Sequence, residues 1–218
     1  MNENYYDKRY TLVEPACNTY LASDEVCYKI IQFLLDFPYL KSDGTMSEVH
    51  SSGSRADLIK YLFYDVGNPL SHKLPTVEDK KKLIFNPARP QKPPLSDKGY
   101  RILNQPKTID VQTDSKVELR IYPLMITPKT PFVGDLLIAF ECWSNMDYLQ
   151  IANFQNRPYN MAMCILSALC GRNLTGVGGL YFDRQNNMNC TLSAVTDNRY
   201  NSGYRLIMGV NIASGTNH

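Results

Sequence analysis

Two neighbouring stretches with the periodicity of β-strands constrain the fold of this chain more than any other feature. Residues 116–122 alternate between apolar and polar side chains, so Val117, Leu119 and Ile121 would lie on one face of a half-buried strand. Residues 134–143 are apolar on one face and on much of the other, as expected of a strand inside a sheet. No helical pattern separates the two stretches, so we expect these strands to pair with each other.

The pattern that follows predicts a helix and two more strands. A helix is predicted over residues 158–170, because Pro158 suits a first helical turn and Gly171 suits the position just after the last. Strands are predicted at residues 180–182 and 204–212. The order strand, strand, helix, strand, strand predicts an α+β fold with a mainly antiparallel sheet packed by two helices. It excludes a doubly wound dinucleotide-binding fold, in which strands and helices alternate.

The other of the two helices is predicted near the N-terminus, over residues 23–37. Ser23 is a favourable N-cap, and Asp24 and Glu25 follow in the first turn, where the helix dipole favours negative charge. The apolar residues of this segment recur at spacings of one, three and four, which is typical of a helix that covers a core. Pro38 ends it.

The composition divides the chain into three parts. Residues 1–66 are expected to hold an irregular lead-in and the first helix, and residues 108–218 the sheet and the second helix. Within the first part, residues 57–64 form a short apolar segment for which we favour an extended strand or a single helical turn. Between the two parts, residues 67–107 hold seven of the thirteen prolines and an excess of basic residues.

The proline-rich segment at residues 67–107 is predicted to be an arm. Its prolines exclude a continuous helix and most ladder pairing. A solvated linker and a phosphate-binding stripe are two interpretations of this composition. We favour a third, an arm that lies across a neighbouring subunit, because its apolar residues would serve as anchors that a linker does not need. These anchors are Leu83, Ile84, Phe85, Leu95, Tyr100, Ile102 and Leu103, and the predicted subunit interface consists of Lys80, Lys81, Lys82, Phe85, Leu95 and Tyr100, with the lysines as rim charges.

A second group of prolines separates the first two strands of the predicted sheet. Pro123, Pro128 and Pro131 lie between them. Because proline interrupts ladder pairing, we expect this hairpin to have a long tip. Such a tip would project from the body of the protein.

The sequence presents no constellation of residues for catalysis or metal binding. None of the three histidines has a second histidine or a carboxylate at ligand spacing, and the six cysteines, none spaced Cys-x-x-Cys, are expected to be small buried apolar residues. The glycine-rich stretch at residues 174–182 precedes a strand and lacks the ending of a P-loop, so we expect a helix-to-strand turn with positive φ angles. We therefore predict no catalytic residue, no cofactor and no metal ion.

The charge and the N-terminal composition point to a protein made in a cytoplasm. A formal net charge of +2 is too small for the molecule as a whole to attract nucleic acid or an anionic membrane. The N-terminus is polar and acidic, and no stretch is apolar over the length needed to span a bilayer. We therefore expect a soluble protein that makes no contact with a membrane.

Five pieces of the chain together resemble the neck and tail-terminator proteins of tailed bacteriophages. They are the run 119–123 leading into a hairpin, the strand ending at 140–143, the helix that begins with Arg157 and Pro158, the stretch 174–180 and the closing strand at 203–208. In contrast to the small terminator proteins, this chain has the long proline-rich insertion.

The resemblance implies a structural virion protein rather than an enzyme. An α+β subunit of this family assembles into a ring that joins the head or portal connector to the tail. The implied partners are further copies of the chain, other neck, portal-adaptor or tail-tube proteins, and genomic DNA in passage. The alternative function is a small nucleotide-binding or nucleic-acid-binding module that uses the glycine-rich turn and the basic arm.

Overall fold

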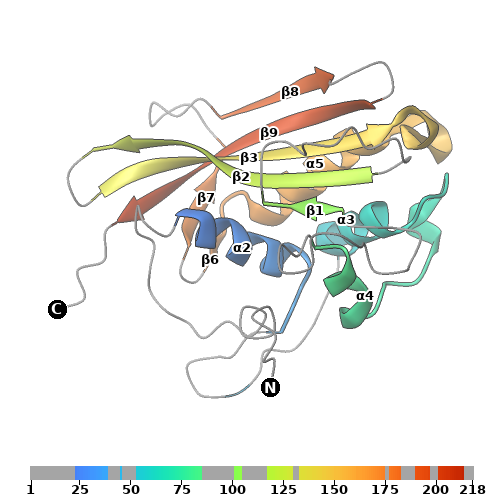
Figure 1. The fold of residues 1–218 in the computed structure, drawn as a ribbon, viewed down its shortest axis with the longest axis horizontal. Coiled ribbons are helices and arrows are strands. Elements are labelled where there is room, and N and C mark those ends of the chain that lie inside the picture. The colour runs from blue at the N-terminus through green and yellow to red at the C-terminus, as the bar shows by residue number, and fades with distance from the viewer. Residues whose placement is uncertain are drawn as a thin grey trace, which may run out of the picture.

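The computed structural model describes residues 23–38, 45, 53–84, 101–104, 117–129, 133–174, 177–182, 190–196 and 201–213. Its largest element is a curled, mostly antiparallel sheet in the order β1, β2, β3, β9, β7, β6, with β8 also paired to β9 (Figure 1). Only β1 and β2 run parallel among these pairs. The strands are β1 (Ile102–Leu103), β2 (Val117–Pro128), β3 (Val133–Asn145), β6 (Asn173–Leu174), β7 (Gly178–Tyr181), β8 (Thr191–Thr196) and β9 (Asn201–Ala213).

Three helices pack with the sheet, and the predicted α+β fold is confirmed. Helix α2 (Ser23–Leu34) packs against β2, and α5 (Arg157–Leu169) packs against β3 and β9. Helix α3 (Gly53–Phe63) packs against α5 and also contacts α2 and β2. Residues 57–64 were expected to be a strand or a single turn, and that expectation is wrong, because they lie almost entirely within this three-turn helix.

The core forms between the helices and one face of the sheet, as the alternation of β2 predicts. The strand register places Ile121 opposite Phe140, and Phe140 opposite Leu206, so these three side chains form a row across β2, β3 and β9. All three are fully buried. At about 25 cal/mol per Å² of buried apolar area, rows of this kind supply most of the stabilisation of such a fold.

The hairpin between β2 and β3 is longer in its strands and shorter in its tip than expected. Strand β2 continues through Pro123 to Pro128, and the register shifts between Pro123 and Met125, where a bulge accommodates a residue without an N–H. The amide of Lys129 donates to the carbonyl of Val133 over 2.8 Å, which closes the hairpin. The prediction of a long tip is therefore wrong.

Two pieces of the predicted arm, residues 83–84 and 102–103, belong to the core of their own chain. Leu83, Ile84, Ile102 and Leu103 are buried, and the amide of Ile102 donates to the carbonyl of Leu83 over 2.9 Å. These four residues were expected to anchor the arm on a neighbouring subunit, and the structure corrects this for all four. The same segment contains the 3-10 helix η2 (Pro69–Ser71) and the short helix α4 (Val77–Lys82), capped by the Thr76 side chain.

Candidate functional site

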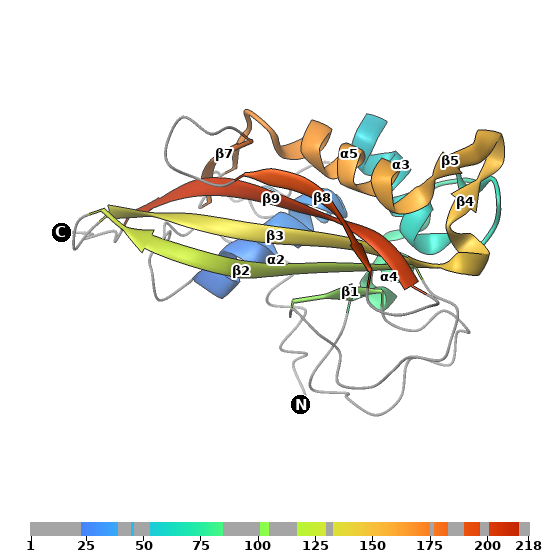
Figure 2. The same cartoon turned by 90° about the horizontal axis from the view of Figure 1, so that it is seen from above.

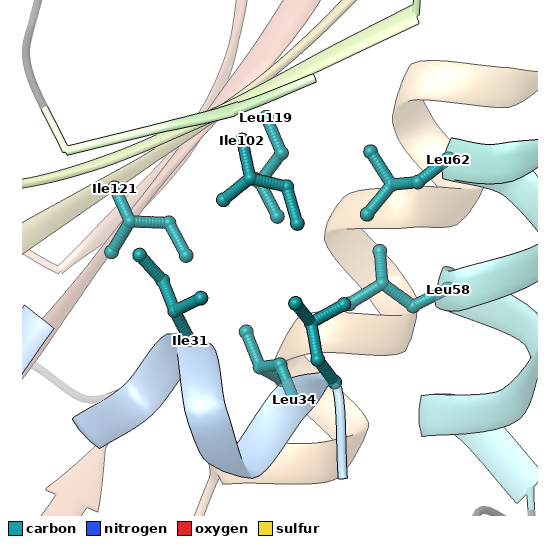
Figure 3. Close-up of a pocket in the computed structure, with 8 residues that line it drawn as sticks. Ile31, Leu34, Leu58, Leu62, Ile102, Leu119 and Ile121 are labelled. Atoms are coloured by element: carbon teal, nitrogen blue, oxygen red, sulfur yellow. The ribbon is translucent and has the colours of Figure 1, made fainter. Parts of the chain in front are cut away.

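The space outlined by eight side chains in Figure 3 belongs to the core. The side chains come from α2, the residue just after it, α3, β1 and β2, and they point toward one another. All are aliphatic and at most 2 % exposed, and they are Ile31, Leu34, Leu35, Leu58, Leu62, Ile102, Leu119 and Ile121. Such a lining offers no group that could orient a polar substrate.

A row of charged side chains crosses the sheet on the face opposite these helices. The register places Arg120 of β2 opposite Glu141 of β3, and Glu141 opposite Arg205 of β9. The Nε of Arg205 donates to Oε1 of Glu141 over 2.8 Å, and Nη1 of Arg120 lies 3.7 Å from Oε2. Arg120 also pairs with Glu118 on its own strand. Two carboxylates and two guanidinium groups therefore balance one another within this network.

Glu141 is the centre of the network and is only 2 % exposed. Its Oε1 accepts a hydrogen bond from the Tyr122 hydroxyl over 2.7 Å, and its Oε2 accepts one from the indole N–H of Trp143 over 3.2 Å. Burial and the bond to Glu141 raise the pKa of Tyr122 to about 12, so the phenol remains a donor at neutral pH. With its acceptor positions occupied, Glu141 ties three strands together and is poorly placed to act as a general base.

Lys80 does not lie where the sequence analysis expected a rim charge. Its side chain is 1 % exposed, and its Nζ donates to the carbonyl of Leu35 over 2.6 Å and to that of Asp36 over 3.4 Å. A cation at the C-terminal end of a helix satisfies carbonyls that have no partner within the helix. Burial lowers the pKa of Lys80. The structure thus corrects the expectation for this residue: Lys80 holds α4 against the end of α2.

The other predicted interface residues are only partly described. Lys81 pairs with Glu78 and Lys82 with Asp79, each at 3.0 Å and each one helical turn apart. These pairs balance two of the three lysines of α4 and the third, Lys80, is buried, which weakens the case for a phosphate-binding stripe in this part of the segment. Their contact with another subunit stays a prediction. Phe85, Leu95 and Tyr100 lie outside the described residues.

The glycine-rich stretch has the expected positive φ at Gly178, but it joins two strands, whereas a turn between a helix and a strand was predicted. Gly178 has a φ of 97°, and β6 and β7 pair antiparallel on either side of the turn. The turn leads into a strand, whereas a phosphate cradle places its amides at the start of a helix. It therefore has the geometry of a hairpin connection.

Three of the five described cysteines are buried, as the sequence predicts, whereas Cys164 is half-buried and Cys170 is exposed, so the prediction is wrong for Cys170. The buried ones are Cys27, Cys142 and Cys190, and burial raises the pKa of Cys142 and of Cys164, the latter to about 12. Within the described ranges, no three histidine, cysteine or carboxylate side chains come together as a metal site would require. Among those same residues, no helix has the length and apolar character to cross a membrane.

The end of the β2–β3 hairpin carries the first of two exposed apolar surfaces. Leu124, Met125, Ile126 and Val133 are 42 %, 47 %, 36 % and 39 % exposed, and we call these four residues the hairpin surface. The partners of Met125 and Ile126 on β3, Leu137 and Leu136, are at most 4 % exposed, so the exposure of residues 124–126 belongs to the outer strand β2 and not to both strands of the hairpin. The prolines of this hairpin predicted a projection at this place.

A second apolar surface is built around Phe154, at the turn of a small hairpin. Strands β4 (Gln150–Ile151) and β5 (Gln155–Asn156) pair, and the 3-10 helix η4 (Ala152–Phe154) connects them. Phe154 is 92 % exposed. Met146, in the 3-10 helix η3 (Met146–Tyr148), and Tyr159, in the first turns of α5, are 55 % and 40 % exposed at the same end of the sheet. We call these three residues the Phe154 surface.

Backbone contacts fix the small hairpin on the body. The amide of Ala152 donates to the carbonyl of Gly67 over 2.7 Å, and that of Arg157 to the carbonyl of Leu149 over 2.9 Å. The side-chain amide of Asn160 donates to Gln155 over 3.1 Å. This surface could not be predicted from the sequence, because a short run between a strand and a helix has no periodicity, and the contact with Gly67 connects distant parts of the chain.

The two apolar surfaces lie at opposite ends of the sheet. Strand β3 begins at Val133, in the hairpin surface, and ends at Asn145, next to Met146. At 3.3 Å per residue, its 13 residues span about 40 Å. Figure 2 shows the β2–β3 hairpin at the left end of the molecule and β4 and β5 at the right end.

Comparison with known proteins identifies a family for this fold. The family model described as YomW matches residues 56–210, which run from α3 into β9 and make up well over half of the chain. No curated protein and no solved structure matches the chain. The match covers the sheet, α5 and both apolar surfaces, and the chain belongs to the YomW family.

Proposed function

We propose that this chain is a structural subunit that assembles with copies of itself into a ring. The observation that carries the proposal is the pair of exposed apolar surfaces at opposite ends of β3. Clustered exposed apolar residues mark interaction sites, and a closed ring needs two different surfaces on each subunit, joined head to tail. A subunit with one such surface at each end of a rigid sheet meets this requirement.

The internal polar network supports a structural function. Glu141 is buried and accepts hydrogen bonds from Tyr122, Trp143 and Arg205, so the most elaborate polar cluster among the described residues is engaged in holding β2, β3 and β9 in register. A sheet fixed in this way keeps the two apolar surfaces at a constant separation. Constant separation and angle between contact surfaces are what allow a ring to close at one copy number.

We propose that the ring belongs to the neck or tail terminus of a tailed bacteriophage. This step rests on the resemblance of residues 119–123, 140–143, 174–180 and 203–208, and of the helix that begins at Arg157, to proteins of that class. In this position the ring joins the head or portal connector to the tail. Its further partners are portal-adaptor and tail-tube proteins, with genomic DNA in passage.

Deletion of the gene from a phage that encodes it tests this proposal. Without the chain, induced cells should release DNA-filled heads and separate tails, and electron microscopy should show few joined particles. Supplying the wild-type gene from a plasmid should restore joining. Joined, infectious particles in normal yield from the deletion strain would overturn the proposed function.

A further inference from the structure

We propose that the outer edge of β8 pairs antiparallel with the same edge of a second copy of this chain, so that one sheet continues across two subunits. The two-fold axis of this contact passes through Ala194. The inference goes beyond the proposed function, because the contact joins like edges and uses neither of the apolar surfaces at the ends of β3. In a closed ring it would join two rings, and without a ring it would give a dimer.

The outer edge of β8 is open. Strand β8 lies outermost at the top of the sheet in Figure 1, and β9 is its partner within the sheet. None of the described residues donates or accepts a hydrogen bond at the outward-facing backbone groups of residues 191–196. Ser193, Ala194 and Thr196 are exposed, and the other three residues are half-buried. Such an edge presents a row of unpaired donors and acceptors, which is a template for a further strand.

The strand register shows which residues of β8 face outward. The amide of Leu180 donates to the carbonyl of Arg172 over 3.0 Å, and its carbonyl accepts from the amide of Gly171 over 2.9 Å, so Leu180 faces away from β9. The neighbouring Tyr181 therefore faces its partner Gly209. Backbone direction alternates along β9, which pairs with β3 without a register shift, so its odd-numbered residues face β8 and meet residues 191, 193 and 195. The residues of β8 that face outward are Leu192, Ala194 and Thr196.

Strand β8 lacks the devices that keep a sheet edge single. The outer edge of β2 carries Pro123 and Pro128, which have no N–H, and the register of β2 shifts at the first of them. Strand β8 has no proline, no charged residue and no register shift along its pairing with β9. Natural sheets protect exposed edges with prolines, charges or bulges, so the absence of all three from β8 indicates an edge that pairs.

The sequence of β8 is complementary to itself. Opposite residues of an antiparallel pair have the same backbone orientation, so outward-facing residues must meet outward-facing residues. A two-fold axis through Ala194 satisfies this rule, with Leu192 opposite the partner's Thr196 and Ala194 opposite its own copy. This register gives about six backbone hydrogen bonds and brings no like charges together. The edge carries no charge that would select a different protein, so the occupant that the sequence favours is a second copy.

The test places charges at the two-fold axis. Ala194→Lys and Ala194→Glu each bring like charges together in a pair of identical copies, whereas a mixture of the two brings opposite charges together. Position 194 is exposed and its N–H faces away from β9, so both variants should unfold close to the wild-type temperature. Asn173→Lys, at an exposed position of β6, is the matched control. Light scattering during gel filtration measures masses up to hundreds of micromolar protein, because a strand pair this short should dissociate on dilution.

A two-fold contact predicts a distinctive result on mixing. The wild type and the control should form assemblies with an even number of copies, and either charged variant alone should have half that mass. Mixing the two charged variants in equal amounts should restore the wild-type mass. Ala194→Pro removes the outward N–H and no bond to β9, so it should halve the mass both alone and when mixed with either charged variant.

The outcomes that overturn the inference are distinct from those that decide the proposed function. A wild type that is monomeric at every concentration, as it would be if β8 bound a strand of another protein, would overturn the inference. Charged variants that keep the wild-type mass, or that lose half of it and do not regain it on mixing, would also overturn it. Gene deletion still decides the proposed function in each case. A dominant dimer that the charged variants dissociate and their mixture restores would support the β8 contact and contradict the ring.

Discussion

Replacing Glu141 with alanine is the change that most severely tests the proposed role of the polar network. The substitution removes the acceptor for Tyr122, Trp143 and Arg205 at a position that is 2 % exposed. It also leaves Arg120 and Arg205 with Glu118 as the remaining carboxylate of the network. Two positive charges then face one negative charge on this face of the sheet.

The expected cost follows from the burial of each partner. Tyr122 and Trp143 are 6 % and 8 % exposed, so each is left with a buried donor without a partner, at about 1 to 3 kcal/mol apiece. The Arg205 side chain is 39 % exposed and can turn toward water, so its contribution is small. Glu141→Ala should therefore lower the free energy of unfolding by about 3 to 5 kcal/mol, as breaking a buried ion pair usually does.

Chemical denaturation followed by fluorescence measures this change, because Trp143 is the single tryptophan and lies in the network. At this chain length the melting temperature should fall by about 2 to 4 °C for each kcal/mol lost. Glu141→Gln keeps one acceptor oxygen and the shape, so it should cost less, and Arg205→Ala should cost about 1 kcal/mol or less. A loss below about 1 kcal/mol for Glu141→Ala would refute the argument that this network holds the sheet.

Three further predictions concern single positions. Gly203→Ala should destabilise the fold by about 1 to 3 kcal/mol in urea denaturation, because its Cβ would lie 2.3 Å from a backbone oxygen of β3, whereas Gly67→Ala, with open space at that position, should be close to neutral. Lys80→Met should cost about 1 to 3 kcal/mol by loss of the bonds to the end of α2, and Lys81→Met less than about 0.5 kcal/mol; equal costs would contradict the buried capping role. Burial and the bond to Glu141 raise the pKa of Tyr122 from 10.0 to about 12, so its neutral form stabilises the fold fully below pH 10 and this stabilisation is lost as the pH rises to 12. Tyr122→Phe should be less stable than the wild type below pH 10 and should lose less stability between pH 10 and 12, and parallel pH profiles of the two proteins would contradict this.

Periodicity was enough to predict the central elements of the fold. The alternation in residues 116–122 and 204–212 predicted β2 and β9 and their core faces, and the cap signals at Pro158 and Gly171 located α5 to within a residue or two. The prediction of a half-buried strand at residues 116–122 is wrong, because the polar face with Glu118, Arg120 and Tyr122 is buried as well. Periodicity could not distinguish a helix from a strand for α3, because the apolar residues of this short aromatic segment are nearly consecutive. Strand β8 was missed because this edge strand is largely polar and half exposed.

The features that depend on tertiary contacts could not be predicted from the sequence. The burial of Lys80 requires the end of α2 to approach α4, although the two are far apart in the chain. The Glu141 network depends on the register of β2, β3 and β9. The alternation of a strand predicts which face a residue lies on, but not which residue of the next strand lies opposite it. The Phe154 surface depends on a turn fixed by Gly67. The predicted interface was therefore placed at the lysines and prolines of residues 67–107, whereas the exposed apolar surfaces of the described structure lie at the two ends of β3.

Native mass spectrometry of the wild-type chain tests the central claim, self-assembly into a ring, most directly. A heterologous contact that closes on itself gives one defined number of copies, because a missing subunit would leave two unsatisfied surfaces. Closure of a ring predicts a single dominant mass that is a fixed multiple, greater than two, of the 24.9 kDa chain, in equilibrium with monomer on dilution. A monomer at every concentration, or a dominant dimer, would contradict it.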